Sequence, residues 1–170
     1  MNNLFGEIEF KPLNRFGKQI PGYYVSKNGN GIVGKDGSFL SVWTNSKGYP
    51  TTTVTIKSDF FPDYTYITRK NRSTISLKIA IHRAVMETWK SIDENPPETL
   101  AKEWNQIITP EMVGQPRIPE NYKQWVKDTA LVDHIDADPT NNNLDNLRWV
   151  IPKDNEPNRK RSKLNESLQN

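Results

Sequence analysis

The chain has 170 residues, 34% of them hydrophobic, no cysteine, and 23 Lys and Arg against 20 Asp and Glu. This length suits one domain or two small ones, and the 5 Trp, 6 Tyr and 6 Phe residues supply large apolar surfaces for a modest core. The lack of cysteine excludes a disulfide framework, a cysteine-ligated zinc site and a thiol nucleophile. Any metal ion would therefore need oxygen or imidazole ligands.

The sequence contains no segment that indicates a membrane. Its first residues lack a basic stretch followed by an apolar one, and no apolar run approaches the roughly 18 residues that would span a bilayer. We therefore expect an intracellular protein with no membrane partner.

The net charge of +3 hides a strong segregation of charge along the chain. Residues 1–90 contain 13 basic and 6 acidic residues, residues 91–146 contain 4 and 11, and residues 147–163 contain 6 and 2. Basic surfaces of this kind favour polyanions such as nucleic acid, although a basic surface can also be merely solvated.

The first part of the chain is typical of short antiparallel strands. β-branched and aromatic runs separated by Gly, Asn and Pro predict strands at 22–26, 38–43 and 51–56, with two more at 64–70 and 74–82. Residues 29–34 match the G-x-G-x-x-G pattern of dinucleotide-binding loops. A further turn at 35–37 follows where such a loop needs a helix, so we interpret 29–34 as a turn between strands.

Helical spacing of apolar residues begins at His82. It predicts a helix that ends before Asn95, a second helix over 98–108 and a short third one around 122–126. The tryptophans in this part are expected to be core residues rather than platforms for base stacking.

The segment 131–155 contains the residues that suit catalysis. It predicts a strand with Asp133 and His134 in it, a polar loop, a second strand and a basic helix. Asp133 is a hard oxygen ligand, His134 can accept a proton near neutral pH, and Asn155 offers a carbonyl oxygen. Two such ligands leave coordination positions for water and phosphate oxygens, as a magnesium-type ion requires.

These residues have other readings when each is taken singly. An Asp-His pair is often only a loop hydrogen bond, and an asparagine run such as 141–143 suits a turn. A calcium loop beginning at Asp136 fails, because its sixth and twelfth positions would be Asn141 and Leu147 instead of Gly and Glu.

Taken together, the spacing of Asp133-His134, Asn146 and Asn155 resembles the HNH motif of the ββα-metal nucleases, in particular the phage HNH homing endonucleases. Residues 142–150 resemble the loop and second strand of those enzymes. Upstream, 81–85 resemble their HR-helix, and 21–26 with 47–49 resemble their β-rich DNA-binding region. An insertion at 91–128 and a proline at position 157, early in the expected metal-bearing helix, depart from the family pattern.

The resemblance implies an α+β fold in three parts: a β-rich DNA-binding region over 1–80, the HR-helix and a helical insertion over 81–129, and a ββα-metal core with a basic C-terminal helix over 130–170. It also implies a DNA endonuclease that leaves 5′-phosphate and 3′-hydroxyl ends. The alternatives are a DNA-binding regulator that keeps the fold without cleavage and, with less support, a calcium-binding interaction module.

The resemblance also implies the roles of individual residues. His134 would be the general base, Asn146 would brace the catalytic loop, and Asp133 and Asn155 would hold one divalent cation, Mg²⁺ or alternatively Mn²⁺, with no zinc. The expected partner is double-stranded DNA, with no small-molecule cofactor, for a monomer or homodimer in the cytoplasm of a bacterial or phage-infected cell. The residues expected to contact DNA are Arg83, Arg148, Arg159, Lys160 and Arg161. Arg148 could alternatively be a solvated strand residue.

Overall fold

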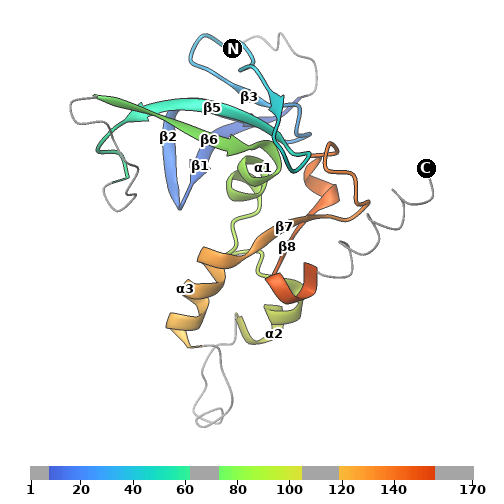
Figure 1. Ribbon diagram of the computed structural model, residues 1–170. Coiled ribbons are helices and arrows are strands. Elements are labelled where there is room, and N and C mark those ends of the chain that lie inside the picture. Colours follow the sequence, from blue (N-terminus) through green and yellow to red (C-terminus); the bar gives the residue numbers. More distant parts are fainter. Residues whose placement is uncertain (1–7, 62–72, 105–118, 156–170) are drawn as a thin grey trace.

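A computed structural model of the chain describes residues 8–61, 73–104 and 119–155. These residues form three small antiparallel sheets and several short helices, so the fold is α+β as the sequence predicts (Figure 1). The expected strand at 64–70 and the basic residues Arg159, Lys160 and Arg161 lie outside these ranges.

The first sheet has the order β1 (Phe10–Arg15), β2 (Lys18–Ser26) and β3 (Ile32–Val33). Strand β1 was not expected from the sequence, because Pro12 and Asn14 interrupt its apolar pattern and only Leu13 is fully buried. Strand β2 contains the predicted strand 22–26. The turn between β2 and β3 contains residues 29–31, whereas Ile32 and Val33 form β3, so the interpretation of 29–34 as a turn is confirmed only for its first three residues.

The second sheet has the order β4 (Trp43–Thr44), β5 (Pro50–Lys57) and β6 (Thr74–Ala80). On β5 and β6 the side chains alternate between a buried face and an outer face, as a sheet packed on one side requires. The prediction of a strand over 38–43 is wrong. Phe39 makes only an isolated bridge to Val33, and regular strand pairing begins again at Trp43.

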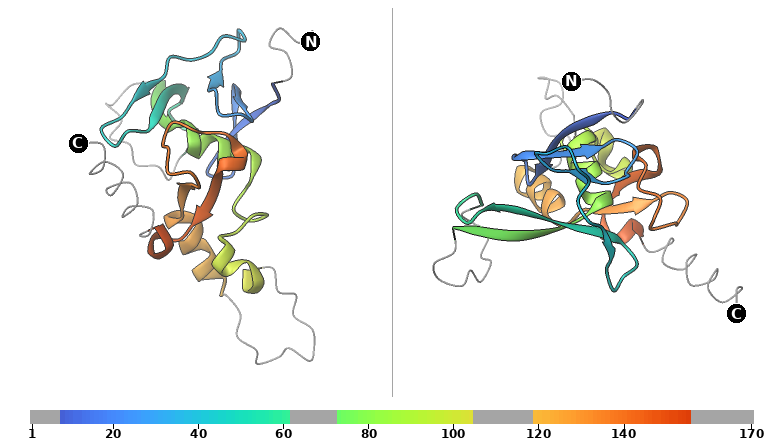
Figure 2. Two further views of the ribbon diagram at one scale, coloured as in Figure 1. Left: turned by 90° about the vertical axis from the view of Figure 1, so that its right-hand side faces the viewer. Right: turned by 90° about the horizontal axis from the view of Figure 1, so that it is seen from above.

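Helix α1 (Ile81–Trp89) follows β6 without a loop and confirms the helix expected from His82 onward. Its buried residues include Ile81, Val85 and Met86. It packs on strands of all three sheets, and Figure 2 shows it at the centre of the molecule. The apolar spacing that predicts this helix therefore also marks the middle of the core.

The predicted helical insertion contains η1 (Glu98–Leu100), α2 (Ala101–Trp104) and α3 (Glu120–Thr129). Trp104 is buried, and its carbonyl accepts a hydrogen bond from Lys123 Nζ at 2.6 Å. Trp125 is 48% exposed, so the expectation of a core role is wrong for this tryptophan.

The third sheet pairs β7 (Leu131–His134) with β8 (Leu147–Val150), and the two strands are joined by a polar loop and η3 (Leu144–Asn146). The short 3₁₀ helix η4 (Pro152–Asn155) follows β8, where the sequence predicts the start of the metal-bearing helix. The described part of the chain contains no helix of the length and apolar character that a membrane span requires.

The turn between β2 and β3 lies directly against the loop between β7 and β8. The amide N–H of Leu144 donates to the carbonyl of Lys27 at 3.2 Å. A Cβ atom added to Gly29 would lie 2.2 Å from the carbonyl oxygen of Asn142. Gly29 also has a φ of +74°, a conformation that L side chains rarely adopt, so glycine is required here for two reasons.

Gly29→Ala is expected to destabilise the protein by about 2–4 kcal/mol, because left-handed backbone strain adds to overlap with Asn142. Gly37→Ala is the matched control, since Gly37 has a φ of +77° and open space around it. It should cost only about 1 kcal/mol. Urea unfolding of the two variants measures the difference, and equal losses would show that the contact with Asn142 contributes nothing.

Candidate active site

His134 is the last residue of β7 and is 5% exposed. Its Nε2 lies 3.2 Å from Oδ1 of Asn142. Asn142 donates a hydrogen bond from Nδ2 to the carbonyl of Thr140 at 3.1 Å, which fixes the orientation of its amide group. Because Oδ1 can only accept a hydrogen bond, the neutral imidazole of His134 carries its proton on Nε2 and leaves Nδ1 as the basic nitrogen.

The Nδ1 atom of His134 makes no hydrogen bond within the described part of the chain. The local geometry therefore gives this imidazole one nitrogen fixed by Asn142 and one nitrogen available to take a proton.

Two aromatic side chains from outside the HNH segment pack against His134. Tyr49, from the turn before β5, stacks on it with ring centroids 5.9 Å apart and an interplanar angle of 20°. His82, the second residue of α1, meets it edge to face at 5.2 Å, and Tyr49 and His82 are themselves 4.7 Å apart. These rings leave the His134 side chain little freedom to rotate.

His82 has the strongest perturbation of its protonation. Burial, followed by the nearby His134 and Arg83, lowers the pKa of His82 to about 3. At neutral pH the ring is therefore uncharged. Its Nδ1 is buried without a hydrogen-bond partner.

Asp133 precedes His134 and lies across from Arg148 in the register of β7 and β8. The carboxylate is 5% exposed, and Arg148 Nε donates to its Oδ2 at 2.8 Å. Arg148 itself is 46% exposed, between the buried Leu147 and Trp149. The residue expected to contact phosphate thus pairs, in this structure, with the residue expected to hold the metal ion.

Asn146 connects the two ends of the catalytic loop. Its Oδ1 accepts from the N–H of Asp136 at 3.1 Å, and its Nδ2 donates to Asp136 Oδ1 and to the carbonyl of Asn141, both at 2.9 Å. The carbonyl of Asn146 also accepts from the N–H of Ile135 at 2.9 Å. These contacts fix the chain immediately after His134 without any charge on Asn146 itself.

Asp136 and Asp138 are occupied by hydrogen bonds within the loop. Burial works to raise the pKa of Asp136, but hydrogen bonds from Asp138, Asn141 and Asn146 outweigh it and lower that pKa. Hydrogen bonds from Thr140 lower the pKa of Asp138. Both carboxylates therefore remain ionised and stabilise the loop through these hydrogen bonds.

Asn155 ends η4, which packs against β7 and β8 and is therefore beside the strand that contains Asp133. An aspartate carboxylate and an asparagine carbonyl are hard oxygen donors of the kind that Mg²⁺ and Mn²⁺ bind. Among the described residues no three His, Asp or Glu side chains form a potential metal cluster. This donor set fits an ion that keeps most of its positions for water and phosphate.

Arg83 takes part in contacts inside the fold. It donates to Glu87 and to the carbonyl of Ala130, both at 2.6 Å, and its guanidinium lies 4.8 Å from the ring centroid of Trp149. These contacts attach α1 to the third sheet. Arg83 therefore has a structural role, and its contact with DNA stays a prediction.

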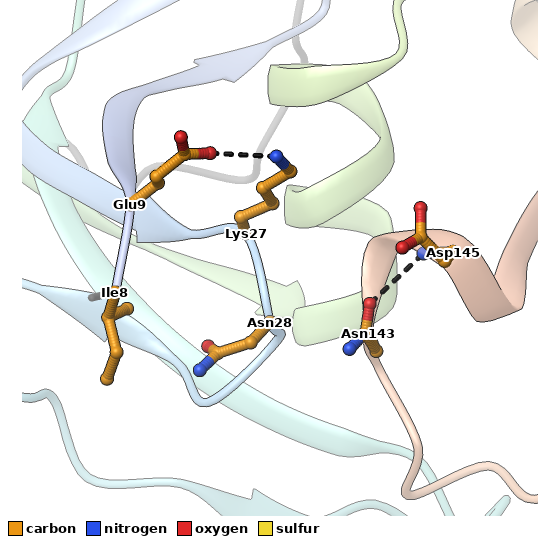
Figure 3. Close-up of a pocket in the computed structure, with 6 residues that line it drawn as sticks. All are labelled: Ile8, Glu9, Lys27, Asn28, Asn143 and Asp145. Atoms are coloured by element: carbon orange, nitrogen blue, oxygen red, sulfur yellow. Dashed lines mark hydrogen bonds and ion pairs between the residues drawn. The ribbon is translucent and has the colours of Figure 1, made fainter.

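A pocket of 440 Å³ lies where the first sheet meets the catalytic loop (Figure 3). It is lined by Lys27 and Glu9, which form an ion pair at 2.8 Å. It is also lined by Asn143, which caps η3 by accepting a hydrogen bond from the N–H of Asp145 at 3.1 Å. Because its lining comes from residues next to β1 and β2 and from η3 with its cap, we interpret it as a junction between two structural elements.

Sequence reasoning missed Asn142 and Tyr49. Asn142 stands between two other asparagines, so only the fold distinguishes the one that contacts His134. Tyr49 is 85 positions before His134, and no local pattern links the two. Their shared signal is only their place in segments that resemble the HNH family.

The resemblance to HNH nucleases is confirmed. Residues 115–156, which include Asp133, His134, Asn146 and Asn155, match the sequence model of the HNH endonuclease family. A solved structure, described as DNA binding and cleavage by the HNH homing endonuclease I-HmuI, is similar to this chain with a TM-score of 0.50 and 19% sequence identity. The similarity covers 95% of this chain and 64% of that chain, and supports the fold. Curated proteins give no match.

Asn142→Ala is expected to remove the hydrogen bond that protects the Nε2 proton of His134. Imidazole ¹⁵N NMR should show a slowly exchanging Nε2–H signal in the wild type and its loss in the variant. Asn143→Ala is the control, because Asn143 caps η3 and does not contact His134. A wild-type signal from an Nδ1–H tautomer would contradict the assignment of the basic nitrogen.

Proposed function

We propose that the chain is a divalent-metal-dependent DNA endonuclease that hydrolyses one phosphodiester bond per active site. The observation that supports this most strongly is the state of His134, a buried imidazole with Nε2 held by Asn142 and Nδ1 open, next to the carboxylate of Asp133. A general base needs this combination of fixed direction and free lone pair.

The proposed step is hydrolysis with proton transfer to His134. Nδ1 accepts a proton from a water molecule as its oxygen attacks the phosphorus atom, and the bond from phosphorus to the 3′ oxygen breaks. Protonation of the leaving oxygen by solvent gives a 3′-hydroxyl and a 5′-phosphate end. The resulting imidazolium remains hydrogen-bonded to Asn142, which is uncharged and accepts equally well from the charged ring.

Asp133 and Asn155 are the residues that would hold the cation. A bound divalent cation would supply charge stabilisation for the pentavalent phosphorus and the leaving oxygen. The Asp133 carboxylate is buried and pairs with Arg148, so a cation that binds it would take the place of the arginine.

Arg148 would change partners when DNA and the cation arrive. Its side chain is half exposed, so it can leave Asp133 and contact a phosphate without disturbing Leu147 or Trp149. Before that exchange, the ion pair keeps the carboxylate from repelling phosphate.

Double-stranded DNA is the proposed substrate, and the outer face of β5 and β6 is the surface that we expect to bind it. Thr55, Lys57, Ser76 and Lys78 are exposed on this face, opposite the buried Val54, Ile56, Leu77 and Ile79. A twisted antiparallel pair with hydroxyl and ammonium groups has the size and chemistry to lie in a DNA groove. One active site per chain fits a nick, and a homodimer would cut both strands.

The endonuclease proposal predicts that the wild type nicks supercoiled plasmid DNA in Mg²⁺ or Mn²⁺ and not in EDTA. His134→Ala should lower the rate by about 10²–10⁴-fold, because it removes the general base. Asp128→Asn, on the exposed part of α3, is the control and should cleave normally.

The same assay distinguishes the alternatives. A wild type that binds DNA and cuts none of it with either metal ion would favour the non-catalytic regulator. Mapping of the cut ends on both strands would then identify a nick or a double-strand break in an active preparation.

Replacement of Lys57 and Lys78 by Ala is expected to weaken DNA binding by about tenfold or more at low salt. Each lysine that leaves a phosphate should lower the slope of log K against log salt by roughly 1, so the double variant should lose about 2. Lys102→Ala, exposed on α2, is the control. Fluorescence anisotropy over a salt series measures both values, and an unchanged slope would exclude this face from the phosphate contacts.

A further inference from the structure

His82 is the second imidazole of the catalytic cluster, and the hydrolysis step proposed above does not use it. Its ring centroid lies 5.2 Å from that of His134, although the two residues are 52 positions apart in the sequence. It is positioned by the start of α1, and α1 is held to the third sheet by Arg83. Its place beside His134 is therefore set by the core of the protein.

His82 is half-buried, and its Nδ1 is buried without a hydrogen-bond partner in the part of the chain that the structure describes. A proton on Nδ1 would be a buried donor without an acceptor, which is costly. The neutral ring therefore carries its proton on Nε2, which is then an N–H donor.

The rings of His82 and His134 meet edge to face, with their centroids 5.2 Å apart. An imidazole ring is small, so Nε2 of His82 and Nδ1 of His134 are separated by at most a few ångströms more than their ring centroids. One phosphodiester group with its attacking water is large enough to contact both. In that arrangement one imidazole accepts a proton and the other donates a hydrogen bond.

We propose that His82 is a further catalytic residue, whose Nε2–H donates a hydrogen bond to a non-bridging oxygen of the scissile phosphate. This inference rests on the endonuclease function proposed above and adds a substrate contact from outside the HNH segment. The hydrogen bond strengthens as negative charge builds up on the phosphate oxygens, so it favours the transition state over the bound substrate.

The surroundings of His82 support a neutral donor. Its low pKa, due first to burial, keeps the ring uncharged at neutral pH. The first turn of α1 contains no acidic side chain, and the residue before the helix, Ala80, makes no side-chain cap, so the electrostatics of this helix end favour an anion. A neutral imidazole at a helix N-terminus that polarises a substrate oxygen is an established catalytic arrangement.

A metal-ligand role fits His82 less well. Within residues 8–61, 73–104 and 119–155, His82, His134 and Asp133 do not form a cluster of the kind that binds a metal ion. A hydrogen bond to phosphate requires only the one nitrogen, Nε2.

The test compares His82→Phe, which fills the same space without a donor, with His82→Gln, whose amide nitrogen can take the place of Nε2–H. The probe is first supercoiled plasmid, and then a synthetic duplex that contains a cleavage site mapped on that plasmid. His82→Phe should lower the single-turnover rate by about 10- to 100-fold, with unchanged affinity for the duplex, and His82→Gln should restore most of the loss.

Phosphorothioate substrates separate a contact from a packing effect. In Mn²⁺, which tolerates sulfur, replacement of one non-bridging oxygen at the cleaved phosphate should slow the wild type, because sulfur accepts hydrogen bonds poorly. The same replacement should not slow His82→Phe any further, since its contact is already lost. A merely structural role of His82 would leave the sulfur effect equal in both proteins.

The outcomes distinguish this inference from the function on which it rests. A wild type that cuts no DNA in either metal ion would contradict the endonuclease proposal and this one with it. If the wild type cuts DNA and His82→Phe cuts it equally fast, the role of His82 alone is overturned. The same holds if the phosphorothioate slows the wild type and His82→Phe equally. Urea unfolding of both variants verifies that each is folded at the assay temperature.

Discussion

The register between β7 and β8 is the constraint on which the rest of the site depends. Asp133 pairs with Arg148, and His134 pairs with Leu147. Since successive side chains of a strand point to opposite faces, this register places His134 against α1 and Asp133 beside Arg148. A slip of one residue would exchange the two faces, so that the base would lose its aromatic neighbours and the carboxylate its cation. Asp133 and His134, which are adjacent in the sequence, thus lie in different surroundings.

Helix α1 transmits this constraint to the β-rich part of the chain. Glu87 accepts hydrogen bonds from Arg15 of β1 and Arg83 of α1, and Arg83 also donates to Ala130, which precedes β7. Leu13 and Trp149, from opposite ends of the chain, lie in the same apolar core. Helix α1 therefore connects the first sheet to the hairpin of β7 and β8, in addition to the direct contact between Lys27 and Leu144. Loss of a contact on either side of α1 is expected to disturb the residues around His134.

Much of this organisation follows from the sequence, but only where the pattern is local. The apolar spacing after His82 predicts α1, and the resemblance of Asp133, His134 and Asn146 to the HNH motif implies a hairpin with a braced loop. The register between β7 and β8 is harder to predict from the sequence. Alternation along β8 predicts that Arg148 is exposed, whereas its contact with Asp133 depends on which residues pair across the strands.

Long-range packing is beyond such patterns. Tyr49 and His82 contact His134 only in the folded chain, where the turn before β5 and the start of α1 meet the end of β7. No periodicity in the sequence connects these three positions. Burial fails as a guide for a different reason. Trp43 and Trp125 are large and apolar, as core residues are, but each lies on an element with a face that no described segment covers.

The electrostatics of the cluster decide which group can receive the proton. His82 stays neutral because protonation would bury a charge beside His134 and Arg83. Asp136 and Asp138 remain ionised through hydrogen bonds within the loop, and both interact favourably with a charged His134. Water screens these exposed carboxylates, so each contributes modestly. The two imidazoles are chemically identical, and their different surroundings are the basis on which we propose a base role for His134 and a neutral donor role for His82.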